Sequence, residues 1–229
     1  MRSLPSHVLT AVTSLLLLAC GSSKDQTRLA PESPAAPVEK APVEQAVRSE
    51  AESGANMDKI DINSDGKPDV FKYYRLVDAG PAQNPNDQGA KVQKKVLVRK
   101  ELDVNFDQRT DIIELYEGEP GKEQKVREEM DMDFDGRMDM TRSFKDGNLT
   151  MVEMDLGFDG KMDSWSYYQM SMDETGKPVN RLLERRRDNN GDGKVDVWEY
   201  YMKGELQKIG TDTDGDGQPD QYRKAEKTK

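Results

Sequence analysis

The chain has 229 residues, of which 34 are Lys or Arg and 44 are Asp or Glu, so that its formal net charge is −10. This acidic balance disfavours nucleic acid and anionic membrane surfaces as partners. Hydrophobic residues make up 34% of the sequence, which is low for one large packed core and favours a thin or repetitive architecture.

The chain opens with the features of an export signal. Arg2 precedes an apolar run over residues 8–18, which is too short to span a bilayer and predicts a cleaved signal at residues 1–19. The run ends in Leu-Leu-Ala-Cys-Gly at 17–21, which resembles the bacterial lipobox. The resemblance implies cleavage before Cys20, a lipid on its sulfur and acylation of its new amine, and it implies an outer-membrane location. The alternative is an ordinary secretory signal that contains a cysteine.

Cleavage before Cys20 and its lipidation would remove two reactive side-chain types and leave carboxylates, Lys, Tyr and Ser. The only histidine, His7, leaves with the signal, and the only cysteine, Cys20, becomes the lipid anchor. The mature chain could then build no Ser-His-Asp or Cys-His site and would lack the usual ligands of zinc, copper or haem. We therefore expect a protein without catalytic residues.

A tether is expected at residues 20–57, which are rich in Pro, Ala, Glu and Ser and contain no aromatic residue. Such a segment buries too little apolar surface to offset the entropy of ordering. As a flexible coil of about 35 residues it would span roughly 30–35 Å and hold a repeat domain at 58–223 away from the membrane. Residues 224–229 form a basic tail.

Six copies of one acidic pattern follow the tether. The pattern is Asp-x-Asp/Asn-x-Asp-Gly-Lys/Arg-x-Asp, with variations, and each copy precedes a short segment with aromatic or branched residues. Such internal repetition indicates a repeat architecture. We number the copies loops 1 to 6, with positions 1 to 9 in each; they cover residues 61–69, 103–111, 131–139, 155–163, 188–196 and 212–220.

The pattern fits a calcium loop, because calcium binds carboxylate, amide and backbone carbonyl oxygens. Positions 1, 3, 5 and 9 would supply side-chain oxygens and position 7 a backbone carbonyl, and a glycine at position 6 allows the sharp turn. We predict Ca2+ in loops 1, 3, 5 and 6. The predicted ligands are Asp61, Asn63, Asp65, Lys67, Asp69, Asp131, Asp133, Asp135, Arg137, Asp139, Asp188, Asn190, Asp192, Lys194, Asp196, Asp212, Asp214, Asp216, Gln218 and Asp220. In loops 2 and 4, where Gln108 replaces the glycine and Gly157 a ligand, a metal-free turn fits equally well.

The loops resemble those of EF-hands, dockerins, thrombospondin type 3 repeats and FG-GAP propellers. In loop 5, Glu199 stands where the EF-hand pattern has its last ligand, so the resemblance implies that it binds metal. The intervals between loops are too short for the helices of EF-hands or for a four-stranded blade. The resemblance therefore covers the loops alone.

The segments between the loops predict β-hairpins, because Tyr, Trp, Val and Ile surround turns of Gly, Pro and Asp. We predict an all-β array of antiparallel hairpins from about Lys59 to Arg223, with roughly ten or eleven strands. Two positions after each loop stand Phe71, Ile113, Thr141, Trp165, Trp198 and Tyr222; five positions after it stand Tyr74, Tyr116, Phe144, Tyr168 and Tyr201. These two columns should face opposite sides of the sheet. We interpret them as packing residues; a ligand groove is the alternative.

Three functions remain open at this point. The first is a non-enzymatic, calcium-stiffened module of the cell envelope that contacts an envelope protein or a surface polymer. The architecture is similar to that of myxobacterial envelope lipoproteins, which implies a part in gliding motility. The second is a calcium sensor with the same residues. The third, a carboxylate-based glycosidase, would have to use leftover residues such as Glu114, Glu153 and Glu184, for which the sequence shows no pairing.

Overall fold

The computed structural model describes residues 56–81 and 91–225. The expected signal and almost all of the tether lie outside these residues. The described residues are all β, as predicted, and contain no helix that is long and apolar enough to cross a membrane. The strands are β1 (Met57–Ile60), β2 (Val70–Pro81), β3 (Lys91–Leu102), β4 (Ile112–Glu117), β5 (Gln124–Met130), β6 (Met140–Lys145), β7 (Asn148–Met154), β8 (Ser164–Met172), β9 (Pro178–Arg187), β10 (Val197–Met202), β11 (Glu205–Thr211) and β12 (Gln221–Lys224).

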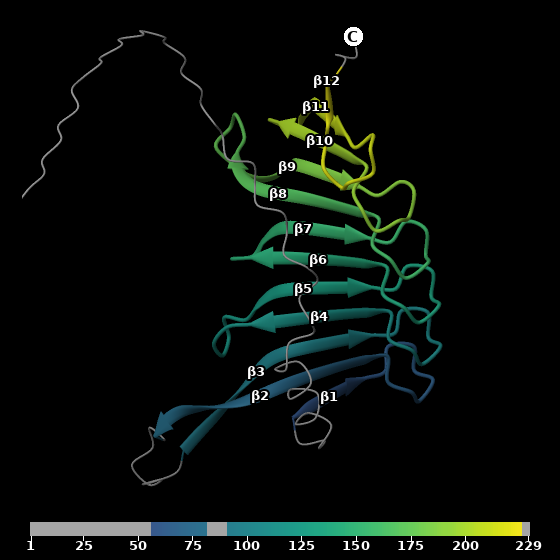
Figure 1. The fold of residues 1–229 in the computed structure, drawn as a ribbon. Coiled ribbons are helices and arrows are strands. Elements are labelled where there is room, and N and C mark those ends of the chain that lie inside the picture. Colours follow the sequence, from purple (N-terminus) through teal and green to yellow (C-terminus); the bar gives the residue numbers. More distant parts are fainter. Residues whose placement is uncertain (1–55, 82–90, 226–229) are drawn as a thin grey trace, which may run out of the picture. The chain divides into compact units, whose positions relative to one another are not determined.

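All of these strands belong to one antiparallel sheet whose spatial order is the order of the chain. Every strand thus pairs with its sequence neighbours, and the six loops lie together along one edge of the sheet, at the right in Figure 1. The twelve strands slightly exceed the expected number. The short outer strands β1 and β12 complete the first and last loops as hairpins.

The turns at the opposite edge explain why the chain reverses there. Two of them have two central residues, Asp146-Gly147 and Lys203-Gly204, all with positive φ between 51° and 84°. This geometry suits a tight hairpin, because its twist matches that of the flanking strands. Glycine at the second position adopts it without steric cost.

Five hairpins carry a β-bulge at the same place. The register shifts in the pairs β2–β3, β4–β5, β6–β7, β8–β9 and β10–β11, each time between the fourth and fifth residues after a loop. A bulge bends its strand and increases the local twist. The repeated shift therefore shapes these five hairpins in the same way.

The pairing register confirms that the two aromatic columns face opposite sides. Trp165 pairs with Glu153 and Arg186, and Trp198 with Arg186 and Gly210, on the side that we call the Trp face. The second column lies on the other side, the Tyr face. There Phe144 and Tyr168 contribute to a groove of about 440 Å3 that Met140, Met154 and Arg142 also line. Buried apolar residues lie on both faces, in keeping with the low hydrophobic content; they are Val70, Tyr73, Val96, Met140, Trp198 and Ile209.

Ion pairs and hydrogen bonds connect the strands on both faces. On the Trp face, buried Glu101 accepts hydrogen bonds from Arg99 Nε at 2.6 Å and from the Tyr73 hydroxyl at 2.9 Å. On the Tyr face, Lys125 contacts both Glu114 and Glu128. These partners matter because a buried charge without one is costly. The sheet is thus held by polar pairs as well as by apolar packing.

Candidate metal centres

The loops are joined by an unbroken series of backbone hydrogen bonds. In each loop, the amide of position 9 donates to the carbonyl just before position 1, as Asp139 does to Met130 at 2.8 Å. The amide of position 1 in the next loop then donates to the carbonyl of position 9, as Asp155 does to Asp139 at 2.7 Å. Five such links connect the six loops, although the loops are unequally spaced in the sequence.

In every loop, the carboxylates of the aspartates at positions 1, 5 and 9 accept hydrogen bonds from backbone amides of the same loop. In loop 3, Asp131 accepts the amide of Gly136 at 2.7 Å, Asp135 that of Arg137 at 2.8 Å, and Asp139 that of Met132 at 2.7 Å. The equivalent bonds occur in the other five loops. Short polar side chains commonly stabilise turns in this way. These three aspartates therefore have a structural role in all loops, including loops 2 and 4.

Positions 4 and 6 of each loop have a left-handed backbone. At position 6, five loops have glycine, with φ between 86° and 96°, whereas Gln108 in loop 2 has a φ of 73°. At position 4, Phe106, Phe134 and Phe158 have φ between 53° and 65°. A side chain makes this conformation unfavourable. The expected sharp turn at position 6 is confirmed, and loop 2 makes it without glycine.

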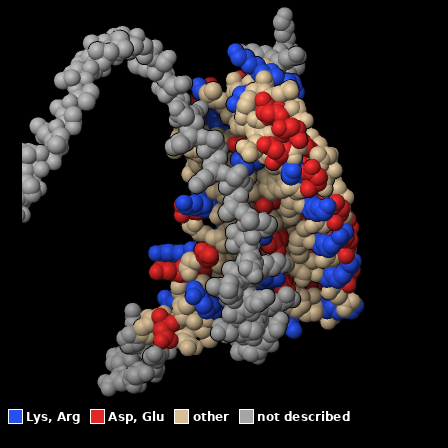
Figure 2. Space-filling view, viewed as in Figure 1, with Lys and Arg blue, Asp and Glu red and all other residues tan. Residues whose placement is uncertain are grey.

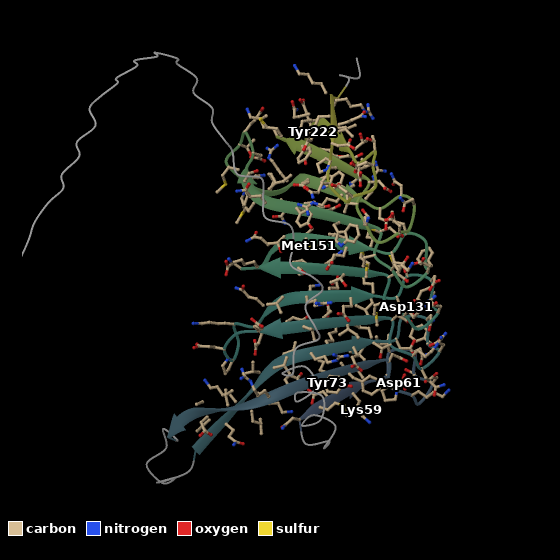
Figure 3. The ribbon with its side chains drawn as sticks, in the orientation of Figure 1. Lys59, Asp61, Tyr73, Asp131, Met151 and Tyr222 are labelled. Atoms are coloured by element: carbon tan, nitrogen blue, oxygen red, sulfur yellow. The ribbon has the colours of Figure 1, made fainter. Side chains whose placement is uncertain are left out.

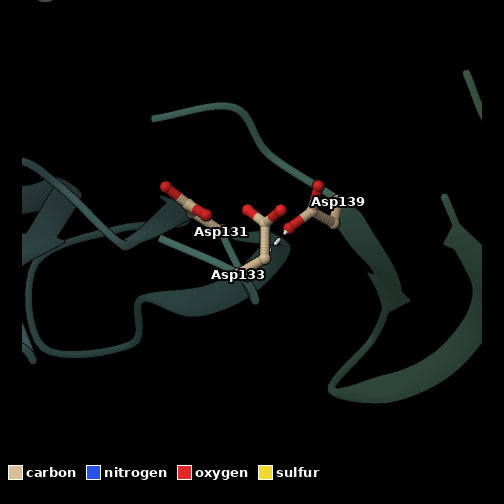
Figure 4. A group of neighbouring side chains, drawn as sticks. All are labelled: Asp131, Asp133 and Asp139. Carbon is tan, nitrogen blue, oxygen red and sulfur yellow. Dashed lines mark hydrogen bonds between the residues drawn. The ribbon is translucent and has the colours of Figure 1, made fainter. Parts of the chain in front are cut away.

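Two loops bring three carboxylates close enough to hold a metal ion. They are Asp131, Asp133 and Asp139 in loop 3 and Asp212, Asp214 and Asp216 in loop 6, each set offering oxygens within 4.8 Å of one another. Figure 4 shows the first set, with Asp133 between the other two. Only these loops have Asp at position 3, where the others have Asn or Gly. Position 3 is therefore what distinguishes a carboxylate cluster from a loop that is merely acidic.

The other predicted sites are less fully assembled. In loop 1, Asn63 accepts the amide of Asp65 at 2.9 Å. In loop 5, the Asn190 side-chain amide donates to Asp196 Oδ1 at 3.0 Å, which occupies one oxygen that the prediction gives to metal. Asn still offers an amide oxygen, so metal in loops 1 and 5 remains a prediction.

Glu199 lies in β10 on the Tyr face. Its Oε1 accepts a hydrogen bond from Arg187 at 2.8 Å, and its Oε2 accepts one from the Tyr201 hydroxyl at 2.9 Å. Arg185 lies 3.7 Å from the same Oε2. A role as the last ligand of loop 5 would require these contacts to break.

In loops 2 to 5, the side chain at position 7 connects its loop to the next one, a role that the sequence reasoning missed. Arg109 Nη2 donates to the carbonyl of Phe134 at 2.8 Å, and Arg137 Nη2 to that of Phe158 at 3.1 Å. Lys161 and Lys194 reach Gly191 and Gly215 in the same way, at 3.5 and 2.5 Å. In each case, position 7 contacts position 4 of the next loop. Loop 6 is the last of the six copies, and it alone has a neutral residue, Gln218, at position 7. That contrast was visible in the sequence.

The two arginines also neutralise their own loops. Arg137 donates to Asp135 Oδ2 from Nε at 2.8 Å and also from Nη2. These two side-chain hydrogen bonds, followed by the bond from the backbone amide of Arg137, lower the pKa of Asp135. Arg109 lowers the pKa of Asp107 by the same contacts. Figure 2 shows the result, acidic and basic side chains alternating along the loop edge.

The pKa of Asp212, in loop 6, is also lowered, but by backbone amides. The largest contribution is the hydrogen bond from Gly217. Unlike the other loops, loop 6 combines four aspartates with a neutral residue at position 7. Its position-5 carboxylate, Asp216, belongs to the cluster, whereas the Arg137-bound Asp135 does not belong to the cluster of loop 3.

The carboxylates that a glycosidase would use already have partners. Glu114 contacts Lys100 and Lys125 at 3.2 and 3.1 Å. Glu184 accepts from Arg186 Nε at 2.6 Å. Burial raises the pKa of Glu153, while Arg127 and a hydrogen bond with Trp165 partly oppose this.

Comparison with known proteins adds no family. No protein-family model matches the chain, and no curated protein matches it significantly.

Proposed function

We propose that this protein is a non-enzymatic calcium-binding lipoprotein of the cell envelope, in which metal in the stacked loops stiffens a β-sheet that contacts another envelope protein or a surface polymer. The observation that carries the proposal is the pair of carboxylate clusters in loops 3 and 6, set in a continuous stack of similar loops. The likeness to myxobacterial envelope lipoproteins extends the proposal to surface motility.

Calcium is the metal that suits these loops best. The clusters offer only oxygen ligands, which calcium and magnesium prefer, and the loops are open. Magnesium demands a tight octahedron and keeps its waters, whereas calcium accepts irregular sets of carboxylates and carbonyls. Like charges so close together also repel unless a cation neutralises them.

A structural role is favoured over a sensor by the loops themselves. Backbone hydrogen bonds close each loop and link it to the next. A large rearrangement on metal binding would have to break these bonds, which favours a scaffold. The membrane anchor rests on the lipobox at Cys20, and the tether would place the sheet away from the bilayer.

The test is a thermal melt of the chain from Gly21 onward, without lipid, in calcium and then in EDTA. This chain contains all of the residues that the structure describes, 56–81 and 91–225. At calcium about ten times the dissociation constant, each site should add roughly 1.4 kcal/mol. Two sites would then raise the melting temperature by roughly 5–10 °C. An unchanged β-type spectrum would support a scaffold, and a large spectral change a sensor.

Two matched variants sharpen this test. Asp216→Asn keeps the oxygen that accepts the amide of Gln218 but removes a charge from the cluster of loop 6, so it should reduce the calcium shift. Asp173→Asn changes a similar turn that lies between β8 and β9 and outside the loops, so it should leave the calcium shift unchanged. Absence of any shift at millimolar calcium would refute the proposal.

A further inference from the structure

The two outer strands of the sheet, β1 and β12, each pair with one neighbour among the described residues. The other edge of each strand pairs with no described strand. Figure 3 shows Lys59 and Tyr222 at opposite ends of the sheet. Asp58, Lys59 and Ile60 are exposed, and so are all four residues of β12. Exposed edges of this kind can pair with another strand.

The stack of loops also has two different ends. Every internal link runs from the amide of position 1 to the carbonyl of position 9 in the preceding loop. Within the described part of the chain, these links run from loop 1 to loop 6. The same link to another copy would use the amide of Asp61 at one end of the stack and the carbonyl of Asp220 at the other. One end therefore offers the donor and the other the acceptor of the same link.

All five internal junctions share one register, which predicts the sixth. The first residue after a loop always pairs with the last residue before the next loop, as Met140 does with Met154. Applied to β12 and the β1 of another copy, the rule pairs Tyr222 with Lys59 and Arg223 with Asp58.

These pairs are chemically complementary. Arg223 and Asp58 have opposite charges on the Tyr face, and cross-strand pairs of this kind stabilise sheets. Lys59 would lie beside the Tyr222 ring on the Trp face, where Lys208 already lies 4.0 Å from that ring's centre. Asp58 is 3.5 Å from Lys95, but both side chains are about half exposed, so its carboxylate remains accessible. Like charges directly opposite each other destabilise strand pairing, but Asp58 and Arg223 are opposite in charge.

We propose that copies of this chain associate head to tail, with β12 of one copy pairing with β1 of the next and loop 6 stacking on loop 1. The two surfaces are different, so each added copy leaves one free end of each kind, and the contact generates an open chain of molecules. Gln218 would lie at this junction, where its amide is a neutral donor for the carbonyl of Ser64. This proposal does not depend on metal.

The test uses charge reversal at the two edges, with self-association followed by sedimentation velocity at physiological ionic strength. In the chain from Gly21 onward, we expect the average mass to rise with concentration. Asp58→Arg places two arginines at the junction and Arg223→Glu places two carboxylates there, so each variant alone should associate about tenfold or more weakly. Lys122→Glu, an equal charge reversal in the β4–β5 turn, should behave as the original chain does.

Mixing the two edge variants provides the decisive result. In an equimolar mixture, every alternating junction again pairs Arg with Asp or Glu, so association should return. Unchanged circular dichroism would show that each variant is folded. The proposal is overturned if the original chain stays monomeric up to about 1 mM, if the edge variants associate as it does, or if the mixture stays monomeric.

Discussion

At the scale of single residues, aspartate serves two purposes in these loops. Asp135 shapes its loop by accepting a backbone amide, and the same carboxylate binds Arg137. Asp133 accepts only the amide of Asp135 at 3.1 Å and extends toward Asp139 in the cluster. The residue type is the same, but only the second arrangement leaves oxygens that face other carboxylates. The number of aspartates in a loop therefore overstates its capacity for metal.

Gln108 should be the least favourable residue at a position-6 turn. A side chain at positive φ costs roughly 1–2 kcal/mol. Glycine avoids this strain but loses more backbone entropy on folding, so Gln108→Gly should stabilise the protein by about 0.5–1 kcal/mol. Urea unfolding would measure the gain. The control, Gln124→Gly in the extended β5, should lower the stability by a similar amount. A loss of stability in Gln108→Gly would mean that its side chain makes a contact worth more than the strain.

Glu153 should make the stability depend on pH. Burial raises its pKa above 4.5, so the folded state binds its proton more tightly than the unfolded state does. The contribution of Glu153 to stability is then largest below pH 4.5 and falls as pH rises through its folded pKa. Glu153→Gln keeps an acceptor for Trp165 without the charge, so its stability relative to the original chain should increase with pH over this window. Parallel pH profiles from urea unfolding at several pH values would contradict the assignment.

At the scale of elements, the loops behave as a stack rather than as six independent sites. Backbone hydrogen bonds join position 9 of one loop to position 1 of the next, and in loops 2 to 5 the side chain at position 7 contacts position 4 of the next loop. A change in one loop therefore acts on its neighbour. We therefore expect the metal affinity of a loop to depend on the cationic side chain beside it.

Arg137→Gln should separate the two roles of this residue. Without the contact to Phe158, we expect a lower melting temperature in EDTA, and with Asp135 released, calcium should bind loop 3 several-fold more tightly. Gln218→Arg should have the opposite effect on affinity in loop 6. Isothermal titration calorimetry would measure both variants. Equal affinities in the two variants and the original chain would show that position 7 does not control metal binding.

At the scale of the whole molecule, the sheet is built from contacts between sequence neighbours. Each strand pairs only with the strands before and after it, so stability is shared along the row of hairpins. A low hydrophobic content is compatible with this arrangement, because buried ion pairs such as Arg186 with Glu184 supplement the apolar packing. The same regularity leaves the two outer strands with matching edges, from which the head-to-tail contact was inferred.

The sequence by itself determined the loops, the hairpins and the opposite faces of the aromatic columns. These depend on contacts within about ten residues, such as the bond from Gly136 to Asp131, and on the alternation of side chains along a strand. Only the tertiary structure decided that all hairpins form one sheet, that Arg137 contacts Phe158, and that Glu199 binds Arg187. Those contacts depend on how repeats stack, and a repeat's own residues fit several stacking arrangements equally well.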